Sequence, residues 1–160
     1  MVDFTPIIEL RGQRLARAQH DLARKRRAVT EAGQRLVEAQ QDAAAFLQQT
    51  RTLESELLMR VLNKSVTTND LLSIDEKLRK TTQRARQLAR IVAMARQVLK
   101  DTSNAFEAAS AEKRAREARL NKSRELHDQL QQIERLRLIA AENAELDEFS
   151  QLFAVARQLA

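Results

Sequence analysis

The chain contains no cysteine, tryptophan or tyrosine, and only two glycines and one proline among its 160 residues. Disulfide bonds and cysteine-ligated metal sites are therefore excluded. β-Sandwiches and doubly wound α/β folds need many turns, and two glycines cannot supply them. Aromatic residues, all of them phenylalanine, make up 3% of the chain, which is too little for a large globular core. Alanine, leucine, arginine, glutamine and glutamate dominate instead, a composition typical of long helices and coiled coils.

Long apolar runs are also missing. No stretch of about 18 apolar residues occurs, so we expect no integral membrane segment. Residues 1–10 lack the basic stretch and long apolar stretch of a secretory signal. The absence of cysteine is compatible with a reducing compartment.

The net charge of +6 is concentrated in two blocks. Residues 11–27 carry seven basic groups against Asp21 alone, and residues 63–100 carry nine basic groups against three acidic ones. The simplest interpretation is a solvated helical face. A more specific interpretation is that the basic blocks bind an acidic partner, which would be a protein surface, a nucleic acid or an anionic lipid.

A seven-residue apolar repeat begins near the N-terminus. One row comprises Ile8, Leu15, Leu22, Val29, Leu36 and Ala43, and a second row comprises Ala18, Ala32, Ala39, Phe46 and Leu53, interrupted by Lys25. Together they predict the a/d seam of a coiled coil. The pattern breaks at residues 63–70, a cluster of turn-forming and capping residues. Within or just after it, Thr67 with Asp70, or Ser73 with Glu76, fits a capping box for a second helix.

A second repeat follows the break. Its rows comprise Leu71, Leu78, Ala85, Val92, Leu99 and Phe106, and Ile74, Leu88, Ala95, Thr102 and Ala109. Both rows fade across residues 112–119, which are almost all polar or alanine. Apolar spacing then resumes in what we interpret as a shifted register, at Leu120, Leu126, Leu130, Ile133, Leu136 and Ala140.

These patterns predict an all-α fold, a long antiparallel two-helix coiled-coil hairpin forming a single domain over residues 1–160. We expect the first helix over about residues 6–62, a turn over 63–69 and the second helix over about 70–158. A turn centred near residue 66 places residue i opposite roughly residue 132 − i. Residues 130–160 then overhang the pair and carry the apolar side chains of Leu146, Phe149, Leu152 and Phe153. The alternative fold, two chains paired in parallel, is disfavoured by the polar break.

No catalytic, cofactor-binding or metal-binding constellation is present in the sequence. The two histidines, His20 and His127, face different positions in the predicted hairpin, and no metal-ligand spacing or phosphate-binding glycine loop occurs. Acidic residues lie three or four positions from basic ones, as in Glu31–Arg35 and Glu112–Arg116, which predicts solvated ion pairs. We therefore expect a non-enzymatic protein without a cofactor. The basic block contains no aromatic residue for base stacking, which favours an acidic protein partner over nucleic acid.

The opening seam IIELRGQRLARAQHDLARKRRAV, the stretch containing Phe46, Arg51, Glu54 and Glu56, the mid-chain break and the chain length resemble one family. It is the central stalk family of type III secretion systems, the YscO/FliJ-like proteins. The resemblance implies a non-catalytic cytoplasmic protein at the cytoplasmic face of the inner-membrane secretion apparatus. Its partners would be the hexameric secretion ATPase, whose pore it enters, the export gate protein and secretion chaperones.

The resemblance also suggests where partners bind. An acidic pore lining would hold the basic residues of the terminal half, which are Arg11, Arg14, Arg17, Arg24, Lys25, Arg26 and Arg27. A second partner would bind apolar residues near the tip, which are Phe46, Leu47, Leu57, Leu58, Leu71 and Leu72. The alternative function is a generic coiled-coil adaptor or a chaperone-binding protein that uses the C-terminal overhang.

Overall fold

The structure, a computed structural model, describes residues 4–63 and 65–158, with the side chains of these residues up to Leu152. Helix α1 spans Thr5–Asn63 and helix α2 spans Thr68–Gln158. No strand occurs in these ranges. The fold is the predicted all-α antiparallel helical hairpin. Each helix begins and ends within two residues of the bound that the sequence suggested.

The chain divides into two compact units. The first, called the turn unit here, contains residues 20–110, and the second, called the terminal unit, contains residues 1–19 and 111–160. Each unit takes one segment from α1 and one from α2, because the two helices run through both units. The two units are described separately below.

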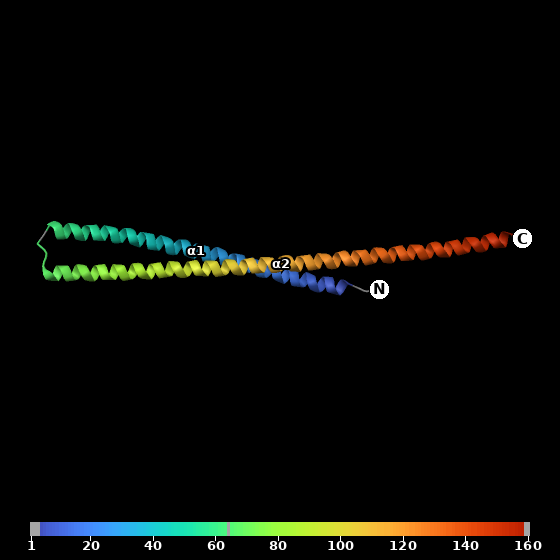
Figure 1. The fold of residues 1–160 in the computed structure, drawn as a ribbon, viewed down its shortest axis with the longest axis horizontal. Coiled ribbons are helices and arrows are strands. Elements are labelled where there is room, and N and C mark those ends of the chain that lie inside the picture. The colour runs from blue at the N-terminus through green and yellow to red at the C-terminus, as the bar shows by residue number, and fades with distance from the viewer. Residues whose placement is uncertain (1–3, 64, 159–160) are drawn as a thin grey trace. The chain divides into compact units, whose positions relative to one another are not determined.

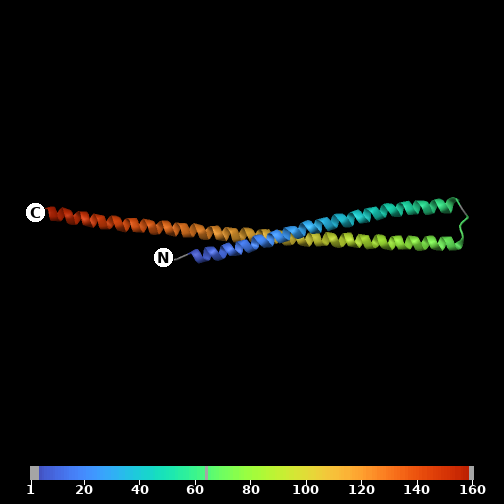
Figure 2. The ribbon, with the colours of Figure 1, turned by 180° about the vertical axis from the view of Figure 1, so that it is seen from behind.

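In the turn unit, α1 and α2 lie side by side and run in opposite directions on either side of the turn (Figures 1 and 2). Their seam follows the seven-residue rows predicted from the sequence. Its most buried side chains are mostly small or aliphatic: Ala32, Ala39, Leu57, Leu88 and Ala109. Alanine at these positions lets two helices approach closely, so the apolar contact is narrow.

Contacts in the turn unit confirm the predicted register. Ala43, Phe46 and Leu47 of α1 line one hollow together with side chains of residues 82–89 of α2. The relation 132 − i places residue 46 opposite residue 86, in the middle of that range. The hollow is therefore a direct consequence of where the turn is centred.

The turn is closed by a capping box at the start of α2. The Thr67 hydroxyl donates to the Asp70 carboxylate at 2.6 Å, and the Thr67 backbone N–H donates to the same oxygen at 3.0 Å. In return, the Asp70 backbone N–H donates to the Thr67 hydroxyl at 3.3 Å. Of the two capping boxes compatible with the sequence, the structure therefore uses Thr67 with Asp70. These bonds satisfy backbone donors that a helix start leaves unpaired.

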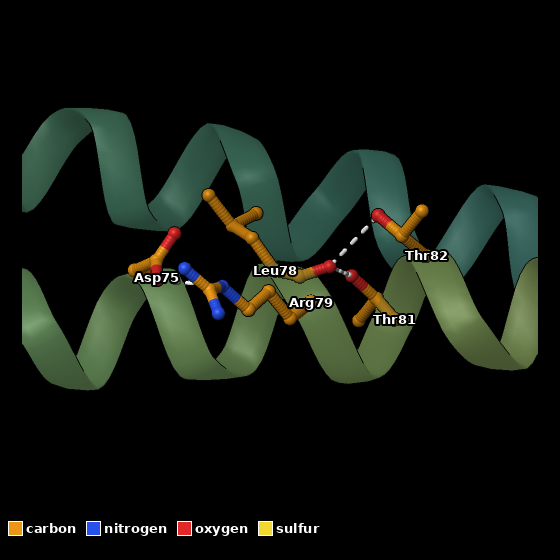
Figure 3. A network of polar contacts seen from close by, with 5 residues as sticks. All are labelled: Asp75, Leu78, Arg79, Thr81 and Thr82. Atoms are coloured by element: carbon orange, nitrogen blue, oxygen red, sulfur yellow. Dashed lines mark hydrogen bonds and ion pairs between the residues drawn. The ribbon is translucent and has the colours of Figure 1, made fainter.

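Threonine hydroxyls in and beside the seam of the turn unit donate hydrogen bonds to backbone carbonyls of their own helix. Half-buried Thr81 and its exposed neighbour Thr82 both donate to the Leu78 carbonyl oxygen, each at 2.9 Å, while the Leu78 side chain points toward α1 (Figure 3). Thr50 donates to the Phe46 carbonyl in the same way, at 2.9 Å. Threonine therefore fits the seam without leaving a buried hydroxyl unpaired.

In the terminal unit, the seam keeps its seven-residue spacing although its residues become polar. Leu120, which is 3% exposed, continues the row that contains Leu78, and Ser123, which is 2% exposed, continues the row that contains Leu88. Lys113 and Arg116 occupy the intervening seam positions and are half-buried. Ala18 is the buried residue on the α1 side.

The predicted register shift after residue 119 is therefore wrong. Leu120 and Ser123 are buried at the unshifted positions and Leu126 is exposed, while Ile133 and Leu136 lie beyond the part of α2 paired with α1 and do not bear on the register. The physical reason is that long Lys and Arg side chains can cover a seam with their aliphatic parts while their charged ends reach polar partners. Apolar spacing alone does not detect such positions.

We predict that the capping box contributes measurably to stability. Replacing Thr67 by alanine removes the hydroxyl contacts of the box, so the free energy of unfolding should fall by about 1 kcal/mol. Ser73→Ala, at the other candidate cap, is the matched control and should change it by no more than about 0.5 kcal/mol. Urea unfolding followed by circular dichroism measures both, and equal losses would contradict this assignment.

We also predict that the stability lost in Thr67→Ala depends on pH. Hydrogen bonds from the Thr67 side chain, and then from its backbone, lower the pKa of Asp70. The pKa of Asp70 is lower in the folded chain than in the unfolded chain. The stabilisation by the Thr67–Asp70 hydrogen bonds is therefore fully present above the unfolded pKa, and it is lost as the pH falls through the folded pKa. The stability difference between wild type and Thr67→Ala should therefore shrink in acid.

Candidate interaction surface

The predicted basic patch is divided between the two units. Arg11, Arg14 and Arg17 belong to the terminal unit, whereas residues 24–27 belong to the turn unit. The seven residues are therefore two groups with separate surroundings. Whether either group binds an ATPase stays a prediction.

The terminal group lies around a hollow that also contains two arginines of α2. Arg11, Arg14 and Arg17 from α1 and Arg116 and Arg119 from α2 line a space of about 380 Å³, called the arginine hollow below. Sequence reasoning did not include Arg116 and Arg119 in the basic patch. The signal was nonetheless present, because the relation 132 − i places residues 14 and 11 opposite residues near 118 and 121.

Arg11 fastens α1 to α2 within the terminal unit. Its Nη1 donates to the Arg119 carbonyl oxygen at 2.8 Å and also to the Ser123 hydroxyl. Ser123 in turn donates to the Arg119 carbonyl at 3.0 Å. The buried hydroxyl is therefore satisfied on both sides, and both acceptors of Arg11 are neutral.

Arg116 makes the reciprocal connection from α2 to α1. Its Nη1 donates to the Arg14 carbonyl oxygen at 3.0 Å, and its Nη2 pairs with the Glu112 carboxylate. Glu112–Arg116 is one of the two ion pairs that the sequence predicted. The guanidinium is thus bound by a backbone acceptor on one helix and a carboxylate on its own helix.

The turn-unit group is more dispersed. Arg24 forms an ion pair with Asp21 at 2.5 Å, although its side chain is largely exposed. Lys25 occupies a seam position and is half-buried, while Arg26 and Arg27 are exposed. An exposed ion pair of this kind contributes little to stability because water and salt screen it. Its effect here is to remove part of the positive charge of this group.

The second basic block, on α2, is partly neutralised by its own helix. Arg79 pairs with Asp75 at 2.8 Å, as Figure 3 shows, and Lys80 pairs with Glu76 at 2.6 Å. The hydrogen bond and charge of Lys80 lower the pKa of Glu76. The predicted Glu31–Arg35 pair is absent from the ion pairs of the described side chains. Both of its members are exposed, where the gain from pairing is small.

Near the turn, the predicted apolar residues separate into buried and exposed ones. Leu57 is 6% exposed and belongs to the seam, and Phe46 is half-buried. Leu47, Leu58, Leu71 and Leu72 are exposed and available to a partner. Sequence reasoning missed Leu62, the most exposed large apolar side chain of the described residues at 77%. It continues the apolar pattern but lies off the seam.

The C-terminal part of α2 extends beyond the N-terminal end of α1 within the terminal unit (Figures 1 and 2). Every described side chain from residue 135 to residue 152 is exposed, including Leu146, Phe149 and Leu152. The Phe153 side chain lies outside the described residues. This segment therefore presents apolar groups that α1 does not cover.

The described residues contain no group of three or more His, Asp or Glu side chains that could hold a metal ion. His127 contacts Gln131 at 2.9 Å through Nε2, which accounts for one ring nitrogen. Across the ranges that the structure describes, neither helix contains a segment long and apolar enough to cross a membrane.

Comparisons of the chain with protein-family models, curated proteins and solved structures found no match. The features of the chain that bear on function are therefore the hairpin, its charges and its exposed apolar groups. Among them, the arginine hollow gathers five guanidinium groups around one space of about 380 Å³.

We predict that Arg116 holds the two helices of the terminal unit together. Arg116→Met keeps the aliphatic part of the side chain but removes the bond to the Arg14 carbonyl. Amide hydrogen exchange should then accelerate by about tenfold in residues 5–19 and 111–127, since a charged hydrogen bond contributes about 1.5 kcal/mol or more. Arg119→Met, which removes an exposed guanidinium, is the control and should leave exchange unchanged. Equal acceleration in both variants would contradict the assignment.

Proposed function

We propose that this chain is a non-catalytic stalk of a bacterial type III secretion apparatus. In this proposal, the chain inserts into the pore of the hexameric export ATPase and links it to the export gate. It thereby promotes ATPase assembly and protein export. It would act in the cytoplasm, at the cytoplasmic face of the inner-membrane apparatus.

The observation that carries the proposal is a helical hairpin with two groups of basic residues on α1, one in the arginine hollow of the terminal unit and one at residues 24–27 of the turn unit. The arginine hollow contains five guanidinium groups, and only Glu112 pairs with one of them through its side chain. A basic surface of this kind is complementary to an acidic pore lining, and complementary charge favours rapid and oriented association. The resemblance of the opening seam to the stalk family points in the same direction.

The residues next to the turn suit an apolar partner. Leu58, Leu62, Leu71 and Leu72 are exposed in the last turns of α1 and the first turns of α2. Exposed apolar residues that cluster in this way are typical of protein-binding surfaces. In the proposal, these residues contact the export gate protein, while the basic residues contact the ATPase.

The test is to measure hexamer formation and ATP turnover of a type III secretion ATPase with and without this chain. We expect stimulation of both. Charge reversal to glutamate at Arg24, Lys25, Arg26 and Arg27 should weaken binding by about tenfold or more, because like charges then face an acidic lining.

The matched control is reversal of Arg84, Arg86, Arg90 and Arg96, four exposed arginines of α2 in the turn unit. It changes the net charge equally but should leave the stimulation intact. An ATPase that neither binds the chain at low salt nor changes its turnover would refute the proposal.

A second candidate function is that of a coiled-coil adaptor that binds secretion chaperones through the C-terminal part of α2. The observation in its favour is the exposure of Leu136, Leu146 and Leu152, which lie beyond the part of α2 paired with α1. Deleting residues 141–160 should abolish chaperone binding while circular dichroism shows an intact hairpin. Chaperone binding that survives the deletion would count against this function.

A further inference from the structure

The arginine hollow combines five positive charges with few compensating groups. Arg11, Arg14 and Arg17 approach from α1, and Arg116 and Arg119 approach from α2, all within the terminal unit. No acidic side chain lines the hollow. Its lining is therefore entirely cationic.

The internal bonds of the terminal unit neutralise only one of these charges. Glu112 pairs with Arg116, whereas Arg11 donates to a backbone carbonyl and a hydroxyl, which carry no net charge. The side chains of Arg14, Arg17 and Arg119 make no hydrogen bond or ion pair with any described residue. The neighbouring Glu117 already pairs with Lys113 at 3.0 Å. About four positive charges thus remain around a space of about 380 Å³.

Positive charges confined in this way repel one another, and a compact anion between them would relieve the repulsion. Guanidinium groups bind phosphate oxygens through paired N–H donors, which adds directional hydrogen bonds to the charge attraction. Consecutive phosphoryl groups concentrate several negative charges within a few ångströms. Such an anion matches both the positive charge of the hollow and the guanidinium donors that line it.

We propose that the arginine hollow is a binding site for an oligophosphate, a chain of two or three phosphoryl groups. The source would be a free oligophosphate or the phosphate tail of a nucleotide. No aromatic side chain lines the hollow, so the phosphates and not a base are recognised. Arg11 and Arg116 are positioned by their backbone bonds, while Arg14, Arg17 and Arg119 supply unpaired donors. The proposal goes beyond the stalk function and does not rest on it.

The test uses the isolated full chain and isothermal titration calorimetry with sodium tripolyphosphate at near-physiological ionic strength. Arg14→Gln, Arg17→Gln and Arg119→Gln are combined in one variant. These side chains are exposed, so the fold should persist, and circular dichroism checks this. We expect the affinity for tripolyphosphate to fall at least about tenfold, since three charge-assisted hydrogen-bonding groups are removed.

The matched control combines Arg26→Gln, Arg27→Gln and Arg35→Gln, three exposed arginines of the turn unit. It loses the same charge and should keep the wild-type affinity. A tetraglutamate peptide provides a second control, because it carries comparable charge without phosphoryl groups and should bind at least about tenfold more weakly.

Further titrations identify the source of the phosphates. ATP binding with an affinity near that of tripolyphosphate, with AMP binding much more weakly, would support a nucleotide tail. Binding of tripolyphosphate alone would support a free oligophosphate. Three results would overturn the proposal: no binding to wild type, equal loss of affinity in the two triple variants, or tetraglutamate binding as tightly as tripolyphosphate. None of these measurements involves an ATPase, so their failure is distinguishable from failure of the stalk function.

Discussion

The seam between α1 and α2 is narrow, and its seven-residue spacing determines which side chains meet in each unit. In the turn unit, alanine, leucine and a few internally satisfied threonines fill it. In the terminal unit, arginine, lysine and serine take many of the same positions. Burial of apolar area is the usual source of helix pairing, and little of it is available there. Hydrogen bonds from arginine to the opposite backbone replace part of it.

Because guanidinium hydrogen bonds take the place of apolar contacts, positive charge lies at the seam of the terminal unit. Arg11 and Arg116 each bind a backbone carbonyl across the seam, which fixes their positions but leaves most of their charge in place. The arginines beside them, Arg14, Arg17 and Arg119, add to the same field. The residues that join the helices of the terminal unit therefore also belong to the arginine hollow, on which the oligophosphate proposal and part of the stalk proposal depend.

Much of the fold could be predicted from the sequence. The scarcity of glycine and proline, the two apolar rows and the polar cluster at residues 63–70 predicted two helices and one turn, and Thr67 with Asp70 was one of two predicted caps. The pairing of Arg11 and Arg116 with backbone carbonyls could not be predicted, because a carbonyl acceptor leaves no trace in residue identity. Residues 112–119 suggested a break in the apolar pattern because Lys113 and Arg116 occupy seam positions there, whereas the seam continues through Arg116 to Leu120 and Ser123. The candidate site was predicted in part, since its α1 arginines were identified and Arg116 and Arg119 were not.

The most direct test of this account is a double-mutant cycle between Arg11 and Ser123. Arg11→Met, Ser123→Ala and the double variant would be compared with wild type by amide hydrogen exchange of the terminal unit. If a guanidinium bond to the buried hydroxyl helps to hold this seam, the two losses should be non-additive, with a coupling free energy of about 1 kcal/mol. Strictly additive losses would contradict the claim that polar bonds replace apolar packing in the terminal unit.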